Sequence, residues 1–147
     1  MPRAKLREKI GKLVTGLPNS REEKVLESAA RSDSCLYDFS LDAGAVGDVD
    51  FGRSLPAGAI VTKIYSDEQT ALTSGGSATV TLKAGSTALT DALAFDSGFT
   101  GRDELALASS AEAIKISAAS ELKISIGTAA LTAGKVRFFI QYLMPND

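Results

Sequence analysis

Carboxylates are the side chains of this 147-residue chain whose number and spacing could support chemistry. Asp67-Glu68 and Asp103-Glu104 are adjacent acidic pairs, and paired carboxylates can act as general acid and general base. Neighbouring residues of a strand point to opposite faces, so neither pair is a natural catalytic dyad. Asp42, Asp48 and Asp50 offer the oxygen ligands that Ca²⁺ prefers, but their spacing does not match an EF-hand loop. We therefore interpret these carboxylates as solvated side chains and expect neither a metal nor a cofactor.

Histidine is absent from the chain, which removes the commonest general base and the commonest metal ligand. Ser-His-Asp and Cys-His mechanisms are excluded by composition alone. The single cysteine, Cys35, can form neither an internal disulfide nor a Cys-x-x-Cys metal site. We interpret Cys35 as a small, semi-buried residue, with a reactive thiol as the alternative. The sequence therefore predicts a protein that is not an enzyme and has no catalytic residues.

The distributions of charged and aromatic residues change near Cys35. Residues 1–35 carry eight Lys or Arg against five Asp or Glu, and they contain no aromatic residue. Residues 36–147 carry eight Lys or Arg against thirteen Asp or Glu, and they hold every Phe and Tyr. The net charges of the two parts are therefore +3 and −5. Such an asymmetry suggests different partners for the two parts. We expect a basic helical N-terminal arm at residues 1–35 and a β-sandwich body at residues 36–147.

The arm is predicted from its apolar spacing. Four aliphatic residues recur at intervals of four, three and four, the period of a helix: Leu6, Ile10, Leu13 and Leu17. Five basic residues lie mostly around the other faces: Arg3, Lys5, Arg7, Lys9 and Lys12. We expect a helix over residues 3–15, ended by Gly16 and Pro18, and a second helix after the capping-box sequence at residues 20–23. Residues 31–34 predict a break into the body.

An isolated helix as short as residues 3–15 is marginal in water, so its apolar stripe needs a partner surface. Docking onto another protein, including a like subunit, is the interpretation that we favour over a frayed, solvated extension. Nucleic-acid contact is a weaker alternative, because no aromatic residue is interleaved with the basic ones for base stacking. Membrane-surface binding is equally weak, because the stripe lacks the aromatic anchors of an interfacial helix.

The body shows the alternation of apolar and polar residues that is typical of half-buried strands. About eight strands are expected, the clearest at residues 36–42, 46–51, 59–67, 78–83, 113–117, 121–126 and 135–144. In the strand at 59–67, Val61, Lys63, Tyr65 and Asp67 are expected on one face, and a turn is expected at residues 131–134. This pattern favours a mainly β fold, an antiparallel sandwich or jelly roll, over a parallel α/β fold.

The last strand is apolar on both faces. Val136, Phe138 and Ile140 form one apolar face, while Phe139 and Leu143 lie on the other. The partial apolarity of the second face predicts either a central strand or a contact between subunits. Phe139 and Leu143 are therefore the candidate oligomer contacts.

The turn-and-strand patterns at Leu55–Ile64, Thr73–Leu82 and Leu131–Tyr142 make the body similar to a group of phage structural proteins. It resembles the β body of the capsid decoration, or cement, proteins and head-fibre bases of tailed bacteriophages. The resemblance covers most of residues 36–147 and leaves the arm out. It implies a jelly-roll-like domain on the outside of an icosahedral shell, commonly as a homotrimer that clamps neighbouring copies of the major capsid protein.

From the resemblance we expect a virion protein of the capsid exterior, made in the host cytoplasm. The residues expected to contact the capsid are those of the arm: Arg3, Lys5, Leu6, Arg7, Lys9, Ile10, Lys12 and Leu13. The alternative is a head- or tail-fibre domain that binds a host receptor or glycan, although the absence of Trp argues against sugar stacking. A hydrolase that uses the acidic pairs is the third hypothesis.

Overall fold

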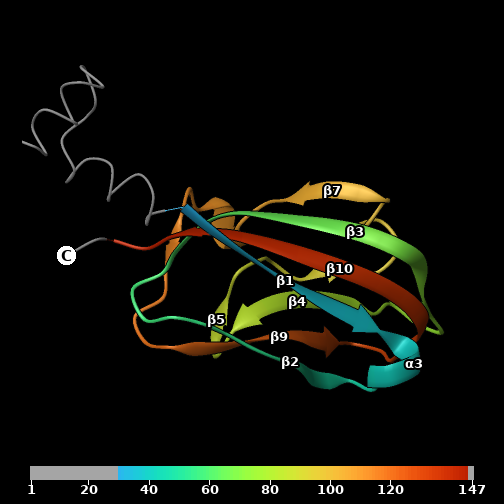
Figure 1. The fold of residues 1–147 in the computed structure, drawn as a ribbon. Coiled ribbons are helices and arrows are strands. Elements are labelled where there is room, and N and C mark those ends of the chain that lie inside the picture. The colour runs from blue at the N-terminus through green and yellow to red at the C-terminus, as the bar shows by residue number, and fades with distance from the viewer. Residues whose placement is uncertain (1–29, 146–147) are drawn as a thin grey trace, which may run out of the picture.

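The computed structural model describes residues 30–145, which form two antiparallel five-stranded sheets packed face to face (Figure 1). The strands are β1 (Ala30–Asp38), β2 (Gly47–Leu55), β3 (Ile60–Ser74), β4 (Thr79–Ala84), β5 (Thr87–Ala88), β6 (Leu93–Ala94), β7 (Arg102–Leu105), β8 (Ile114–Lys115), β9 (Ser120–Gly127) and β10 (Leu131–Leu143). A short helix, α3 (Phe39–Asp42), connects β1 to β2, and a 3₁₀ turn, η1 (Ala108–Ser110), precedes β8.

The strand order identifies the sandwich as a jelly roll. One sheet has the order β1-β10-β3-β7, with β8 also paired to β3, and the other has the order β2-β9-β4-β5, with β6 also paired to β4. The chain passes from one sheet to the other between β1 and β2 and again between β3 and β4 (Figure 1). This is the double-sheet arrangement of jelly rolls. The expected mainly β, antiparallel sandwich is thereby confirmed.

The core lies between the two sheets because each long strand contributes one apolar face. In β9 the buried residues Leu122, Ile124 and Ile126 alternate with polar neighbours, as the period of two requires. Phe138 of β10 meets Phe99 edge-to-face, with ring centroids 6.0 Å apart. Burial of each such side chain contributes about 1.5–3 kcal/mol, so these central positions dominate the stability of the sandwich.

The region before Cys35 differs from its prediction. The expected break at residues 31–34 is part of β1, which pairs with β10 from Ala30↔Leu143 to Asp38↔Lys135. These polar residues are tolerated because β1 is the edge of its sheet and much of it faces solvent. Residues 30–35 therefore lie in the sandwich, whereas the two helices expected for the arm fall outside the described residues.

Three further expectations about the body are wrong in detail: the end of the strand at 36–42, the turn at 131–134 and the face on which Val61 lies. The strand expected at 36–42 ends at Asp38, because α3 begins there, and the turn expected at 131–134 is the irregular start of β10. Val61 points into the core, whereas Lys63 is exposed, because the pairing of β3 with β10 shifts between Gln141 and Tyr142. The strands number ten rather than about eight among residues 30–145, since short two-residue pieces occur between β4 and β9.

Candidate interaction surfaces

The acidic pairs make local structural contacts instead of converging. Asp67 Oδ1 lies 3.3 Å from Arg102 Nε, and the two residues are directly opposite across β3 and β7. Asp103 Oδ2 accepts hydrogen bonds from the backbone N–H of Thr100 at 2.9 Å and from its hydroxyl at 2.6 Å. The hydroxyl bond, followed by the backbone bond, lowers the pKa of Asp103. Asp67 is thus engaged with β7 across the sheet, and Asp103 fixes the loop that leads into β7.

The three aspartates considered as calcium ligands are also dispersed. Asp48 pairs with Lys123 at 3.2 Å, and its pKa is lowered chiefly by a hydrogen bond with that lysine. Asp50 accepts a hydrogen bond from the backbone N–H of Gly52 at 2.8 Å. Within residues 30–145, no group of three or more His, Cys, Asp or Glu side chains lies close enough to hold a metal ion.

Cys35 lies in β1 with its side chain buried in the core. Burial, with a smaller contribution from the charge of Asp33, raises the pKa of the Cys35 thiol to about 12. The thiolate is the nucleophilic form of cysteine, so this residue is protonated and inert at neutral pH. The interpretation of Cys35 as a packing residue fits this environment better than the reactive-thiol alternative does.

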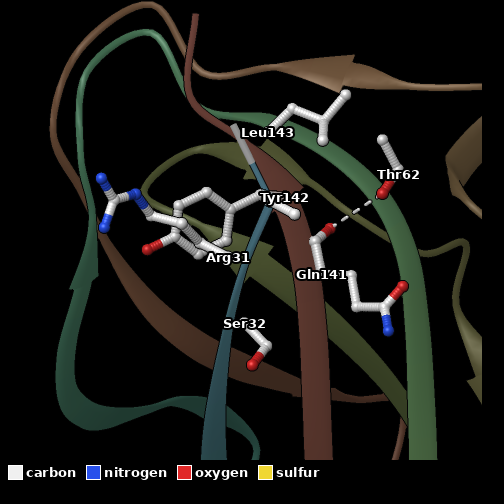
Figure 2. A pocket seen from close by; sticks show the side chains of 7 residues that line it. Arg31, Ser32, Thr62, Gln141, Tyr142 and Leu143 are labelled. Carbon is white, nitrogen blue, oxygen red and sulfur yellow. Dashed lines mark hydrogen bonds between the residues drawn. The ribbon is translucent and has the colours of Figure 1, made fainter. Parts of the chain in front are cut away.

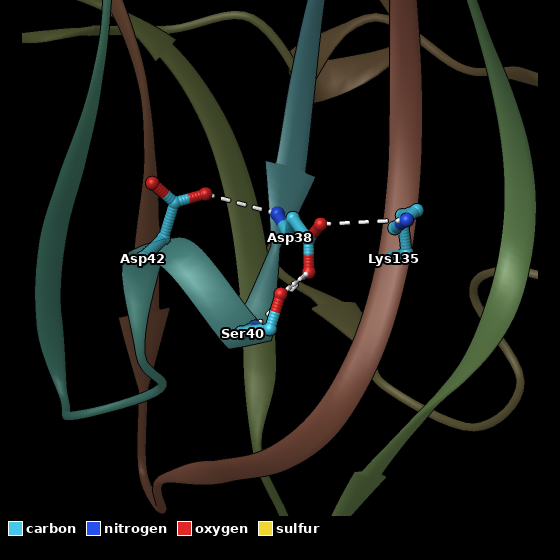
Figure 3. A network of polar contacts seen from close by, with 4 residues as sticks. All are labelled: Asp38, Ser40, Asp42 and Lys135. Carbon is cyan, nitrogen blue, oxygen red and sulfur yellow. Dashed lines mark hydrogen bonds and ion pairs between the residues drawn. The ribbon is translucent and has the colours of Figure 1, made fainter.

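A polar network fixes the turn from β1 into α3 (Figure 3). The Asp38 carboxylate caps the helix by accepting hydrogen bonds from Ser40 N at 3.0 Å and Ser40 Oγ at 2.7 Å. Its second oxygen lies 3.4 Å from Lys135 Nζ, and its own backbone N–H donates to Asp42 Oδ2 at 2.9 Å. The Ser40 hydroxyl bond is the main cause of the lowered pKa of Asp38.

The segment that this network anchors, residues 39–46, is named here the tip. The Tyr37 hydroxyl donates a 2.7 Å hydrogen bond to the carbonyl of Ala43, which ties the tip to the buried face of β1. Leu41 and Val46 are nevertheless 81% and 58% exposed. Their exposure was not expected from the sequence, because both residues lie in segments predicted to be strands with a buried face.

The outer surface of the β1-β10-β3-β7 sheet, facing away from β2, β9 and β4, is named here the outer face. At its centre Ser34, Phe139, Tyr65 and Glu104 lie directly opposite one another in a row across the four strands. Phe139 is 39% exposed and Leu143, further along β10, is 40% exposed. The two candidate oligomer contacts are therefore accessible on a single chain, and their role in association stays a prediction.

Two shallow hollows lie along this sheet. One, of about 460 Å³, lies beside Tyr65 and Phe139 and is lined on its far side by residues 102–104 of β7. The other, of about 310 Å³, lies beside Leu143 near the start of β1. Figure 2 shows Arg31 beside the ring of Tyr142 in this second hollow. Both hollows are wide open to solvent, so neither would enclose a small molecule.

The opposite outer surface, formed by β2, β9 and β4, is polar throughout its centre. Its cross-strand rows consist of Asp, Lys, Ser and Thr: Asp48, Ser125 and Thr81 in one row, and Asp50, Lys123 and Lys83 in the next. Such a surface is suited to solvent. The two outer surfaces of the sandwich are thus chemically different at their centres, because Phe139 and Tyr65 lie on one and the other has only polar side chains in its central rows.

The candidate capsid contacts of the arm fall outside the described residues: Arg3, Lys5, Leu6, Arg7, Lys9, Ile10, Lys12 and Leu13. In the part of the chain that the structure describes, no helix has both the length and the apolar character needed to cross a membrane.

Comparisons with known proteins show similarity of fold. No family model matches the chain, and no curated protein matches it. A chain of the acidic stable capsid structure of Helicobacter pylori bacteriophage KHP30 matches with a TM-score of 0.55 and 15% identity, over 81% of this chain and 90% of that one. A chain of the cyanophage Pam1 capsid asymmetric unit matches with a TM-score of 0.52 and 18% identity, over 79% and 85%. A chain of the Ralstonia phage GP4 capsid has a TM-score of 0.45 and 18% identity, over 81% and 88%.

Proposed function

We propose that this chain is a structural protein of a phage virion that binds the outside of the capsid and stabilises it. The observation that carries the proposal is the extent of the jelly-roll match to chains of two phage capsid structures, which covers about four fifths of this chain. The match spans 85–90% of those chains, so the fold is shared over nearly the whole length of each of them. Fold alone does not determine function, and the surface features of this chain supply the rest of the argument.

The surface chemistry of the described residues favours association over catalysis. The acidic pairs are engaged in local contacts, and Cys35 is buried and protonated. The sandwich instead exposes two aliphatic residues at the tip, and it exposes an aromatic and an aliphatic residue on one outer surface. In the proposed association, these exposed apolar groups are the ones that a partner would cover.

In the proposed mechanism, the arm attaches the sandwich to the shell. Its basic residues steer the chain to an acidic or mixed capsid surface, and burial of its apolar stripe (Leu6, Ile10, Leu13) holds it there. The partner in this mechanism is the major capsid protein. A homotrimer at a local three-fold position is the arrangement implied by the resemblance, and it belongs to the proposal.

The test is binding of the purified chain to phage heads that lack it, measured by co-sedimentation and quantitative gel analysis. The wild-type chain should bind at a fixed number of copies per head and raise the temperature at which heads release DNA. A variant with Leu6→Asp, Ile10→Asp and Leu13→Asp should lower occupancy at least tenfold. Lys83→Glu, on the polar surface of β4, is the control and should leave occupancy unchanged.

A truncated chain gives an independent measurement, and it should begin at Ala30. Beginning at residue 36 would remove most of β1 and with it the pairing to β10, so lost binding would be ambiguous. Full occupancy by the chain that begins at Ala30 would contradict the role of the arm. Failure of the wild-type chain to bind the heads would contradict the proposed function itself.

A further inference from the structure

We infer that the tip of one copy of this chain docks in the hollow beside Leu143 of a second copy, and that three such contacts close a ring. This contact supplies the interface of the homotrimer within the proposed function, on which the inference rests. It forms in the absence of capsid, so its failure can be distinguished from a failure to decorate heads.

The tip is an apolar projection whose shape is fixed before any partner arrives. Leu41 and Val46 are the two most exposed large apolar side chains of residues 30–145. The backbone that carries them is held on one side by the Asp38 cap of α3. On the other side it is held by the 2.8 Å hydrogen bond from the Leu131 N–H to the Gly44 carbonyl. Docking of a preformed segment loses little conformational entropy, which favours association.

The hollow of about 310 Å³ at the start of β1, named here the Leu143 hollow, has the complementary shape. It is lined by residues 30–32, Thr62 and residues 141–143 (Figure 2). Leu143, which is 40% exposed, and the partly buried Tyr142 give it apolar surface. An open hollow suits a projecting group of a second protein, because the protein atoms around that group cover the polar rim.

Charge selects the pairing of tip with hollow over the pairing of like surfaces. Asp42 is the one charged residue of the tip, and Arg31 is the one charged residue that lines the Leu143 hollow. Neither forms an ion pair with another of residues 30–145. Tip on tip would bring two carboxylates together, and hollow on hollow would bring two guanidinium groups together. Tip in hollow places opposite charges face to face, which fixes the partner and the direction of the contact.

The charges around the two surfaces do not reverse this complementarity. Beside the tip, Asp38 is already paired with Lys135 at 3.4 Å. Beside the hollow, Lys63 Nζ lies 4.0 Å from Glu104 Oε1. Lys115 of β8, at the same end of β3 as the hollow, adds positive charge there. The surroundings of the hollow are therefore neutral or positive, and the tip remains negative.

The positions of the two surfaces favour a closed ring. They lie at opposite ends of the sandwich, separated by the nine residues of β1, which span about 26 Å (Figure 1). The tip projects from an end of the sandwich, whereas the Leu143 hollow opens on the outer face, so each contact turns the direction from one copy to the next. A head-to-tail contact that turns in this way closes into a ring when the rotation permits.

Ring closure also accounts for stability from a small contact. The tip and the hollow together cover less than the roughly 800 Å² per partner of a standard interface. In a ring of three, however, the last contact forms within one assembly and therefore at a high effective concentration. A single contact is weak by itself, and the closed trimer is the stable form.

The first experiment is sedimentation equilibrium of the full chain without capsids, over a range of micromolar concentrations. The wild-type chain should associate into three copies. Leu41→Asp should weaken association at least tenfold, because it places a charge on the side chain that enters the hollow. Arg31→Glu should do the same by placing a carboxylate opposite Asp42. Lys83→Glu is the matched charge reversal on the polar outer surface and should leave association unchanged.

The second experiment determines the direction of the contact. Leu41→Cys places a thiol on the tip and Leu143→Cys places one in the hollow, while Cys35 is buried and protonated and does not compete. During oxidation by copper phenanthroline, each single variant should stay unlinked on a non-reducing gel. An equimolar mixture of the two should form disulfide-linked pairs, and the double variant should form linked trimers.

Thermal unfolding of every variant checks that the fold is retained. A wild-type mass of one or two copies would overturn the ring. Linked pairs from a single cysteine variant would overturn the head-to-tail direction, because they require a two-fold contact. Failure of the mixture to link would overturn the docking of tip in hollow, and it would leave the tip to a different macromolecule.

Discussion

Replacement of Gly44 by alanine tests how tightly the tip is held to the sandwich. The Gly44 carbonyl accepts a 2.8 Å hydrogen bond from the backbone N–H of Leu131, the first residue of β10. A Cβ on Gly44 would overlap the Leu131 carbonyl oxygen and lie 2.8 Å from its carbonyl carbon. Backbone atoms cannot rotate away as a side chain can, so the tip and β10 must separate. Overpacking of this kind costs about 1–3 kcal/mol, and loss of the hydrogen bond adds about 0.5–1.5 kcal/mol.

The free energy of unfolding should therefore fall by about 2–4 kcal/mol in Gly44→Ala, as measured by urea unfolding followed through tyrosine fluorescence. With an m-value of about 2 kcal/mol/M, the unfolding midpoint should fall by about 1–2 M. Gly75→Ala is the control, because no atom lies within 4 Å of a Cβ built there, and its effect should stay within about 0.5 kcal/mol. Equal midpoints for the two variants would refute the view that the tip is rigidly clamped to β10.

Three further predictions concern the core, the thiol and acid stability. Phe138→Ala should lower the free energy of unfolding by about 3–5 kcal/mol, because it leaves a cavity between the sheets, whereas Leu41→Ala at the exposed tip should change it by less than about 0.5 kcal/mol in the same urea assay. Cys35 should react with a thiol reagent only as fast as the protein opens, since burial raises its pKa to about 12; rapid stoichiometric labelling of the native chain would contradict its burial. The pKa values of Asp38 and Asp103 are lowered from 3.8 in the folded chain, so their stabilising contribution is complete above that pH and is lost as the pH falls through the lowered values. Thermal unfolding from pH 7 to pH 2 should show the melting temperature falling below about pH 4, and a melting temperature that holds constant there would count against these contacts.

Local alternation was enough to predict the strands whose inner face packs in the core. Residues 121–126 alternate cleanly and form most of β9, because one face of that strand is buried between β2 and β4. Residues 31–34 have no apolar residue, and their strand conformation depends on β10, more than a hundred residues later in the sequence. The end of β1 at Asp38 depends on a side-chain cap and on Lys135, also distant in sequence. The local alternation of apolar and polar residues contains no information about either of these long-range contacts.

The candidate surface was predictable in part for the same reason. Phe139 stood out because a polar position was expected opposite Phe138 on a half-buried strand. Its neighbour Tyr65 could be assigned to a face but not to a partner, since the register between β3 and β10 includes shifts that no turn sequence encodes.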